Sequence, residues 1–77
     1  LKLTPTEFNL LEILLSNKGQ VLSGEKLFHL LRENEYYLKA TNTITVHIRN
    51  LREKMQDSFE HPEYIKTVWG VGYIIEA

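Results

Sequence analysis

The sequence predicts a mainly α-helical domain that ends in a β-hairpin. Three segments carry apolar residues at helical spacing, and two β-type runs joined by a glycine-containing connection follow them. The chain has 77 residues, of which 43% are hydrophobic, so we expect one small ordered domain with a modest core. No apolar run approaches the ~18 residues of a membrane span. The absence of cysteine excludes disulfides and cysteine-based metal sites.

The first helix is predicted at about residues 5–17. Thr4 is a capping residue, Pro5 takes the first helical position, and Glu7 completes a capping box. Gly19, with its access to left-handed backbone conformations, ends the helix. One apolar face is expected, formed by Phe8, Leu11, Leu14 and Leu15.

The second helix begins after Ser23, which is a good capping residue. Its short apolar stripe is predicted to comprise Leu27, Leu30 and Leu31, and the pattern stops at residues 32–35. Residues 36–40 then read as a loop with aromatic side chains. The connection to the next helix is about nine residues long, which exceeds the 3–4 residues of an ordinary helix-turn-helix.

The third helix is predicted at about residues 42–56, capped by Thr41 or Asn42. Its core stripe has spacings of 4, 3 and 4, and comprises Ile44, Ile48, Leu51 and Met55. Residues 64–68 and 73–75 are β-type runs, and two glycines in the four-residue connection indicate a hairpin at 64–76. Three helices followed by a hairpin predict a winged helix-turn-helix, with the hairpin as the wing.

The outward face of the third helix has the chemistry of a DNA-reading surface. Opposite the core stripe lie Asn42, Val46, Arg49, Asn50 and Glu53, while Thr45 and Arg52 lie on one flank and His47 and Lys54 on the other. Asn, Arg and Thr side chains read base edges, and a valine contacts thymine methyl groups. The alternative is an ordinary solvated helix face. Against this alternative, a residue that only meets water need not be apolar, yet position 46 is a valine.

The distribution of charge supports this interpretation, although a net charge of −1 and a pI near 6.3 argue against a nucleic-acid binder at first. Residues 1–38 carry a net charge of −1, residues 39–56 carry +3, and residues 57–77 carry −3. A net positive charge is therefore confined to the third helix and the segment that leads into it.

Three motifs resemble the effector domain of OmpR/PhoB-type response regulators, and most nearly the vancomycin-resistance-type regulators of Gram-positive bacteria. They are TPTEF at 4–8, NTITVHIRNLREKM at 42–55 and YIKTVWGVGY at 64–73. The resemblance implies a cytoplasmic two-component transcription factor of bacteria. Its receiver domain is phosphorylated by a histidine kinase, and it binds double-stranded promoter DNA as a dimer. It also implies that residues 1–77 are an effector domain without its receiver and with most of an N-terminal sheet missing.

The resemblance also assigns site residues by position. The DNA-contacting places of the third helix fall on Asn42, Thr45, Val46, His47, Arg49, Asn50 and Arg52, with Lys54 on its flank, and those of the wing fall on Thr67 and Trp69. The segment that contacts RNA polymerase falls on residues 33–40, which include Glu33, Asn34, Glu35, Tyr36, Tyr37, Leu38 and Lys39. The family carries basic residues at positions 42, 50 and 69, where this chain has none. We therefore expect weak binding by a monomer and a shallow salt dependence.

Other functions are less well supported by the residues. The acidic C-terminal segment and the missing wing cation suggest, as an alternative, a protein-interaction module with weakened DNA binding. An enzyme would need a nucleophile with a general base or a pair of acidic residues in a cleft, and the sequence pattern indicates neither. His29 and His61 lie in separate elements without metal-ligand spacing, so no metal or cofactor is expected. Trp69 is equally compatible with DNA contact and with packing of the hairpin onto the core.

Overall fold

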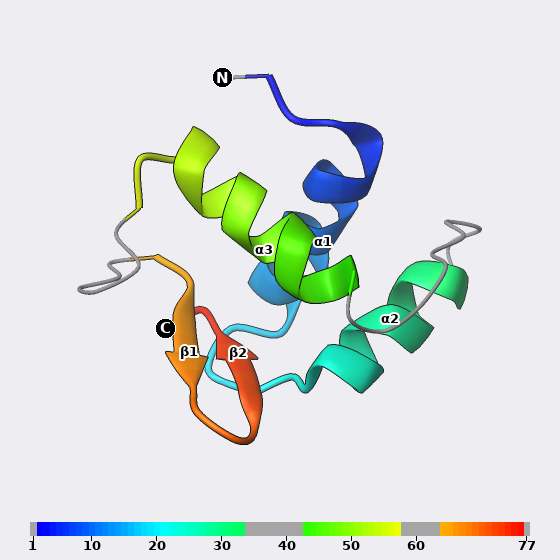
Figure 1. The fold of residues 1–77 in the computed structure, drawn as a ribbon. Helices are drawn as coiled ribbons and strands as arrows, with labels where there is room; N and C mark the ends of the chain where they lie inside the picture. The colour runs from blue at the N-terminus through cyan, green and yellow to red at the C-terminus, as the bar shows by residue number, and fades with distance from the viewer. Residues whose placement is uncertain (1, 34–42, 58–63, 77) are drawn as a thin grey trace.

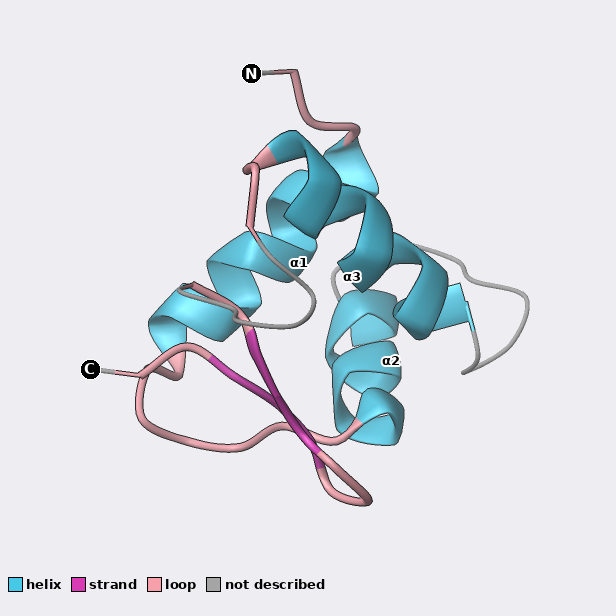
Figure 2. Ribbon diagram, turned by 60° about the vertical axis from the view of Figure 1, so that its left-hand side comes forward, coloured by secondary structure: helices cyan, strands magenta, loops and turns pink. Residues whose placement is uncertain are grey.

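The computed structural model describes residues 2–33, 43–57 and 64–76. In chain order the elements are α1 (Pro5–Ser16), α2 (Gly24–Glu33), α3 (Thr43–Lys54), β1 (Lys66–Val68) and β2 (Gly72–Ile74). Figures 1 and 2 show the three helices packed together, with the hairpin projecting from the side of the bundle. The predicted class, three helices followed by a wing, is confirmed.

The start and end of α1 follow the sequence signals. Thr4 Oγ1 accepts a hydrogen bond from the Glu7 backbone N–H at 3.2 Å, and Glu7 Oε1 accepts one from the Thr4 N–H at 2.9 Å. This reciprocal pair is the predicted capping box, with Pro5 in the first turn. The chain then turns at Gly19, whose φ of +85° requires the conformational freedom of glycine.

The predicted apolar face of α1 is wrong in detail. Leu10, Ile13 and Leu14 are buried together with Glu7, whereas Phe8 and Leu15 are about half exposed. Apolar residues occupy more than half of the circumference of this helix, so periodicity alone does not select the buried face. Packing against α2 and α3 selects the face of Leu10 and Leu14.

The cap of α2 is as predicted, because Ser23 Oγ accepts a hydrogen bond from the Lys26 N–H at 3.0 Å. Its buried residues differ by one position from the expected stripe. Leu27 and Leu31 are buried as predicted, together with Phe28, whereas Leu30 is only partly buried.

The core stripe of α3 is confirmed, with Ile44, Ile48 and Leu51 buried and Met55 packed at the edge. The helix ends at Lys54, two residues before the expected position. Gln56 adopts a left-handed conformation (φ 58°), and its N–H and that of Asp57 donate to the carbonyls of Glu53 and Arg52. This Schellman-type ending uses glutamine in place of glycine, which hides it from sequence analysis.

The hairpin pairs Lys66 with Ile74, Thr67 with Tyr73, and Val68 with Gly72. Its tip turns through Gly70, which has a φ of +77°. Tyr73 also exchanges both backbone hydrogen bonds with Leu22, in the connection between α1 and α2. A Cβ atom on Gly72 would lie 2.2 Å from the Leu22 carbonyl oxygen, so this close approach requires glycine.

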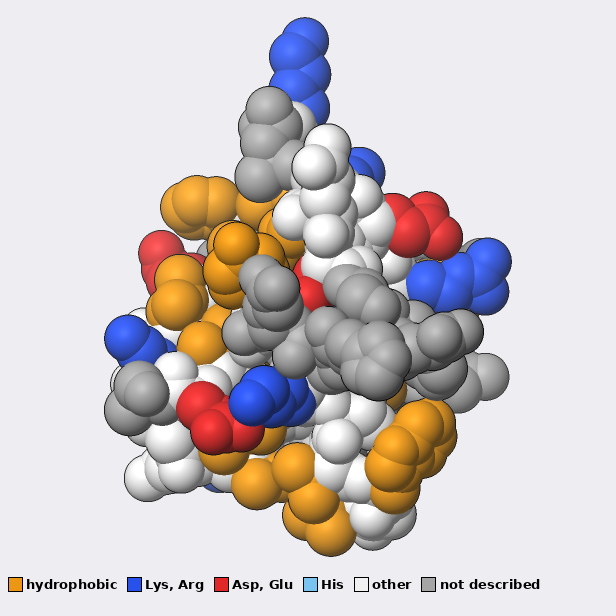
Figure 3. All heavy atoms as spheres, turned by 90° about the vertical axis from the view of Figure 1, so that its left-hand side faces the viewer, with side chains coloured by type: hydrophobic (Ala, Val, Ile, Leu, Met, Phe, Trp, Pro, Cys, Tyr) orange, Lys and Arg blue, Asp and Glu red, His pale blue; other side chains and the backbone are white. Residues whose placement is uncertain are grey.

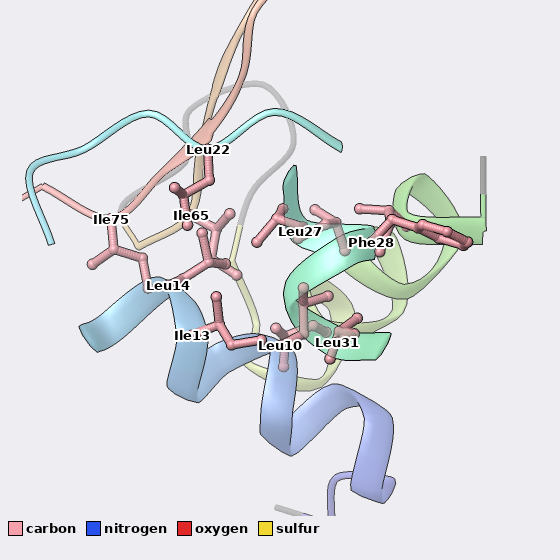
Figure 4. Packing of buried hydrophobic residues seen from close by; sticks show 12 residues of the cluster. Leu10, Ile13, Leu14, Leu22, Leu27, Phe28, Leu31, Ile65 and Ile75 are labelled. Atoms are coloured by element: carbon pink, nitrogen blue, oxygen red, sulfur yellow. The ribbon is translucent and has the colours of Figure 1, made fainter. Parts of the chain in front are cut away.

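The hydrophobic core joins all three helices to the base of the hairpin. Figure 4 shows leucines of α1 and α2 directed toward Leu22, Ile65 and Ile75. Because Ile65 and Ile75 flank the two strands, the hairpin is attached to the core at its base while its tip extends away (Figure 2). In the ranges that the structure describes, no helix has the length and apolar character needed to cross a membrane.

Candidate nucleic-acid interface

Part of the predicted outward face of α3 is accessible in the structure. Thr45, Val46 and Arg49 are exposed, and His47 and Asn50 are partly exposed. We call these five residues the α3 surface. Val46 is 54% exposed, which confirms an apolar side chain directed into solvent.

Arg49 lies beside Glu53 on this helix, with 3.8 Å between Arg49 Nε and Glu53 Oε1. Both side chains are largely exposed, so the pair contributes at most about 0.5 kcal/mol to stability. Such a weak pair leaves the guanidinium available to a more strongly charged partner such as phosphate.

Trp69 lies at the tip of the hairpin and is 77% exposed, so its ring does not pack onto the core. Val71, on the other side of the tip, is also exposed. Of the two alternatives for Trp69, the structure therefore supports an outward-facing role.

A cavity of about 360 Å³ lies between α3 and the wing. Thr45 and Arg49 line it from the helix, and Thr67, Trp69 and Tyr73 line it from the hairpin. The structure thus brings residues of the α3 surface and both predicted wing residues to one concave site.

The predicted placement of Arg52 on an exposed flank is wrong. Arg52 is only 6% exposed, and its Nε and Nη2 donate to the Ile65 carbonyl at 3.1 and 2.7 Å. Nη2 also donates to Thr67 Oγ1 at 2.7 Å, and the guanidinium lies 5.8 Å from the centre of the Tyr73 ring. Burial lowers the pKa of Arg52, while the charge of Asp57 opposes the shift. The helical wheel missed this arrangement because the fold of the hairpin creates it.

Lys54 also lies away from the α3 surface. Its Nζ is 2.6 Å from Oε1 of Glu7, which is buried at the start of α1. The sequence predicted Glu7 as a capping residue but gave no sign of this second partner, 47 positions away.

Tyr73 is a residue of this site that the sequence pattern does not predict. Its hydroxyl donates to Thr45 Oγ1 across the cavity at 3.4 Å, and its ring lies against Arg52. The hairpin register, which places Tyr73 opposite Thr67, is the signal that points to it.

Several predicted site residues lie outside the described ranges. These are Asn42 and residues 34–40 of the predicted polymerase-contacting loop. Glu33, the first residue of that segment, is exposed and is the last residue of α2. Within the described part of the chain, no three His, Cys, Asp or Glu side chains gather in a way that suits a metal ion.

Charged side chains are dispersed on the face seen in Figure 3, where lysines and arginines alternate with acidic and apolar side chains. Lys66, at the base of the wing, is paired with Glu76 at 2.9 Å. Between Thr67 and Tyr73 the wing has no charged residue. The cation of the α3 surface is therefore Arg49, and the wing contributes aromatic and polar groups.

Comparison with known proteins decides the family. Residues 1–75 match the family model described as "Transcriptional regulatory protein, C terminal". The chain belongs to this family. It is 64% identical to the regulatory protein VanR of Enterococcus faecium over 76 residues, covering 99% of this chain and 33% of VanR. It is 50% identical to VanRc of Enterococcus gallinarum over 74 residues, covering 96% of this chain and 32% of VanRc.

Solved structures agree with this assignment to the transcriptional-regulator C-terminal family. The C-terminal domain of the nisin resistance regulator NsrR superposes with a TM-score of 0.84 at 38% identity, covering 100% of this chain and 76% of that one. The RstA DNA-binding domain of Klebsiella pneumoniae, solved in complex with the RstA box, gives a TM-score of 0.83 at 31% identity, covering 97% and 73%. The present chain spans about a third of the length of VanR and VanRc.

Proposed function

We propose that this chain is the sequence-specific DNA-binding output domain of a two-component response regulator. In this proposal α3 enters the major groove of promoter DNA and the hairpin lies beside it as the wing. The supporting observation is the arrangement around the cavity, where Thr45 and Arg49 of α3 and the exposed Trp69 of the wing lie on its two sides. An α-helix with its side chains is 10–12 Å wide, which matches the ~12 Å major groove.

The chemistry of the α3 surface assigns a role to each side chain. Arg49 is suited to guanine or phosphate, Asn50 to adenine, and Val46 to a thymine methyl group, while Thr45 and His47 are suited to backbone phosphates. Trp69 packs on sugar and backbone atoms at the wing. Because Arg49 is the cation of this surface, we propose that the domain alone binds weakly and depends on a second copy for affinity.

The proposed partners are those of the complete regulator. They are promoter DNA, RNA polymerase, a receiver domain in the same polypeptide and the histidine kinase that phosphorylates it, all in the cytoplasm. We propose that a dimer occupies two direct repeats about one helical turn apart, and that the chain acts by binding and not by catalysis. In-vitro selection of DNA with the full-length phosphorylated regulator tests the spacing.

Fluorescence anisotropy of the 77-residue chain with a labelled promoter-duplex library tests the central proposal. We expect binding at about 50 mM salt that weakens steadily as salt increases. The control is Lys18→Ala, which removes an exposed cation in the turn after α1 and is expected to bind like the parent. A flat titration at 50 mM salt would contradict DNA binding and favour a protein-interaction module.

A further inference from the structure

Arg52 occupies a junction between α3 and the wing. Its buried guanidinium contacts the Ile65 carbonyl just before β1 and the Thr67 hydroxyl within β1. Asp57 supports the same junction, because its Oδ2 accepts hydrogen bonds from the Tyr64 and Ile65 N–H groups at 3.3 and 3.0 Å. The start of the wing is therefore held by side chains at the C-terminal end of α3.

A second contact between α3 and the wing lies about two helical turns from Arg52. Thr45 and Arg52 are seven residues apart and lie on one face of α3, about 10 Å apart along its axis. Thr45 contacts the Tyr73 hydroxyl, and Arg52 contacts both the ring of Tyr73 and Thr67, the residue opposite it in the hairpin. Two contacts at this separation restrain both the distance and the tilt of the wing relative to α3.

We propose that Arg52 is a positioning residue, which holds the wing against α3 so that Trp69 and the α3 surface engage the same DNA molecule. This inference rests on the proposed function. The fork of the guanidinium is the feature that matters, because Nε and Nη2 share one carbonyl while Nη2 also reaches Thr67. A lysine retains the charge but provides a single donor centre, which cannot span these acceptors in the same way.

Positioning and direct phosphate contact predict different salt dependences. A cation that contacts phosphate contributes about 0.9 to the slope of log K against log salt. The wing between Thr67 and Tyr73 has no charged residue, so a displaced wing loses contacts without losing phosphate ion pairs. If Arg52 positions the wing, its loss weakens binding and leaves the slope unchanged.

The test compares Arg52→Lys, Arg52→Gln and Arg49→Ala, each with and without Trp69→Ala. Binding is measured by anisotropy on a duplex selected from a randomised library by the parent chain, across a range of salt concentrations. We expect both Arg52 variants to bind about tenfold more weakly with an unchanged slope, the loss expected from one charge-assisted hydrogen bond. In the Trp69→Ala background the same changes should have little further effect, because the wing contact is already absent.

Arg49→Ala is the matched control. It should reduce the magnitude of the slope of log K against log salt by about one. Its effect on binding should add to that of Trp69→Ala. The positioning role is overturned if Arg52→Lys binds like the parent while Arg52→Gln lowers the slope, or if the effects of Arg52 and Trp69 are additive. Thr67→Val, which removes one acceptor of the fork, provides the same test should Arg52→Gln fail to fold.

A measurement on the free protein separates this inference from the proposed function. Trp69 is the single tryptophan of the chain, so time-resolved fluorescence anisotropy reports the motion of the wing tip directly. We expect faster depolarisation in Arg52→Lys than in the parent. A parent that binds no duplex would refute the proposed function, whereas unchanged depolarisation in a binding-competent chain would refute the role of Arg52.

Discussion

The carboxylate of Glu7 and the ammonium group of Lys54 lie 2.6 Å apart and join the first turn of α1 to the last residue of α3. Glu7 is only 3% exposed, and its Oε1 accepts hydrogen bonds from both Lys54 and the Thr4 N–H. One carboxylate therefore caps α1 and also forms an ion pair with the last residue of α3. This contact directs Lys54 toward the body of the domain and away from the α3 surface.

Replacing Glu7 is expected to destabilise the fold. Glu7→Gln removes the charge that satisfies Lys54 and should lower the free energy of unfolding by about 1–3 kcal/mol, since the lost hydrogen bonds are buried and charge-assisted. Glu12→Gln, on the exposed side of the same helix, is the control and should change it by less than about 0.5 kcal/mol. Urea unfolding followed by circular dichroism compares them, and equal effects would refute this role.

Acid should remove the contribution that Glu7 makes to the free energy of unfolding. Burial by itself raises the pKa of Glu7, but the hydrogen bonds from Lys54 and Thr4 and the charge of Lys54 outweigh it, so the pKa lies below the ordinary value of 4.5. The unfolded chain then binds the proton more tightly than the folded one. The stabilisation is present above pH 4.5 and is lost as pH falls through the lower folded-state pKa. Unfolding experiments from pH 7 to pH 3 should show a smaller acid loss in Glu7→Gln; an identical loss would exclude Glu7 as its source.

Gly72→Ala should disrupt the attachment of the wing. The added Cβ would meet the Leu22 carbonyl oxygen at 2.2 Å, and backbone atoms cannot move aside without breaking the bridge between Leu22 and Tyr73. We expect a loss of about 1–3 kcal/mol in unfolding free energy. Gly24→Ala is the control, because nothing lies within 4 Å of its added Cβ. Thermal unfolding measures both, and a neutral Gly72→Ala would contradict the described approach.

The Arg49–Glu53 pair should tune DNA affinity without affecting stability. Glu53→Gln removes a negative charge beside Arg49 and should tighten binding, because the Glu53 carboxylate no longer competes with phosphate for the Arg49 guanidinium. Arg49→Ala should weaken binding. Both variants should unfold within about 0.5 kcal/mol of the parent. Anisotropy titrations on the selected duplex provide the check, and a Glu53→Gln chain that binds more weakly would be inconsistent with this account.

Local signals predicted local structure well. The capping box at Thr4 and Glu7, the turn at Gly19 and the stripe of Ile44, Ile48 and Leu51 each depend on residues within a few positions of one another. The hairpin likewise follows from its glycines and β-type runs. These features require no knowledge of how the elements pack.

Long-range packing was less accessible from the sequence. The helical wheel of α1 included Phe8 and Leu15 in the core face, although packing exposes both. The helical wheel of α3 likewise placed Arg52 in solvent, whereas the hairpin covers this side chain in the structure. In both cases the environment of a side chain is set by an element far along the chain, which a periodicity argument does not include.

The most direct test of the central claim is a titration of the ¹⁵N-labelled chain with the selected duplex, followed by backbone amide chemical shifts. DNA binding through α3 and the wing predicts the largest changes at residues 45–50 and 69–71, with α1 little affected. Changes concentrated on the exposed side of α1 around Phe8 and Leu15, or no changes at all, would contradict the account.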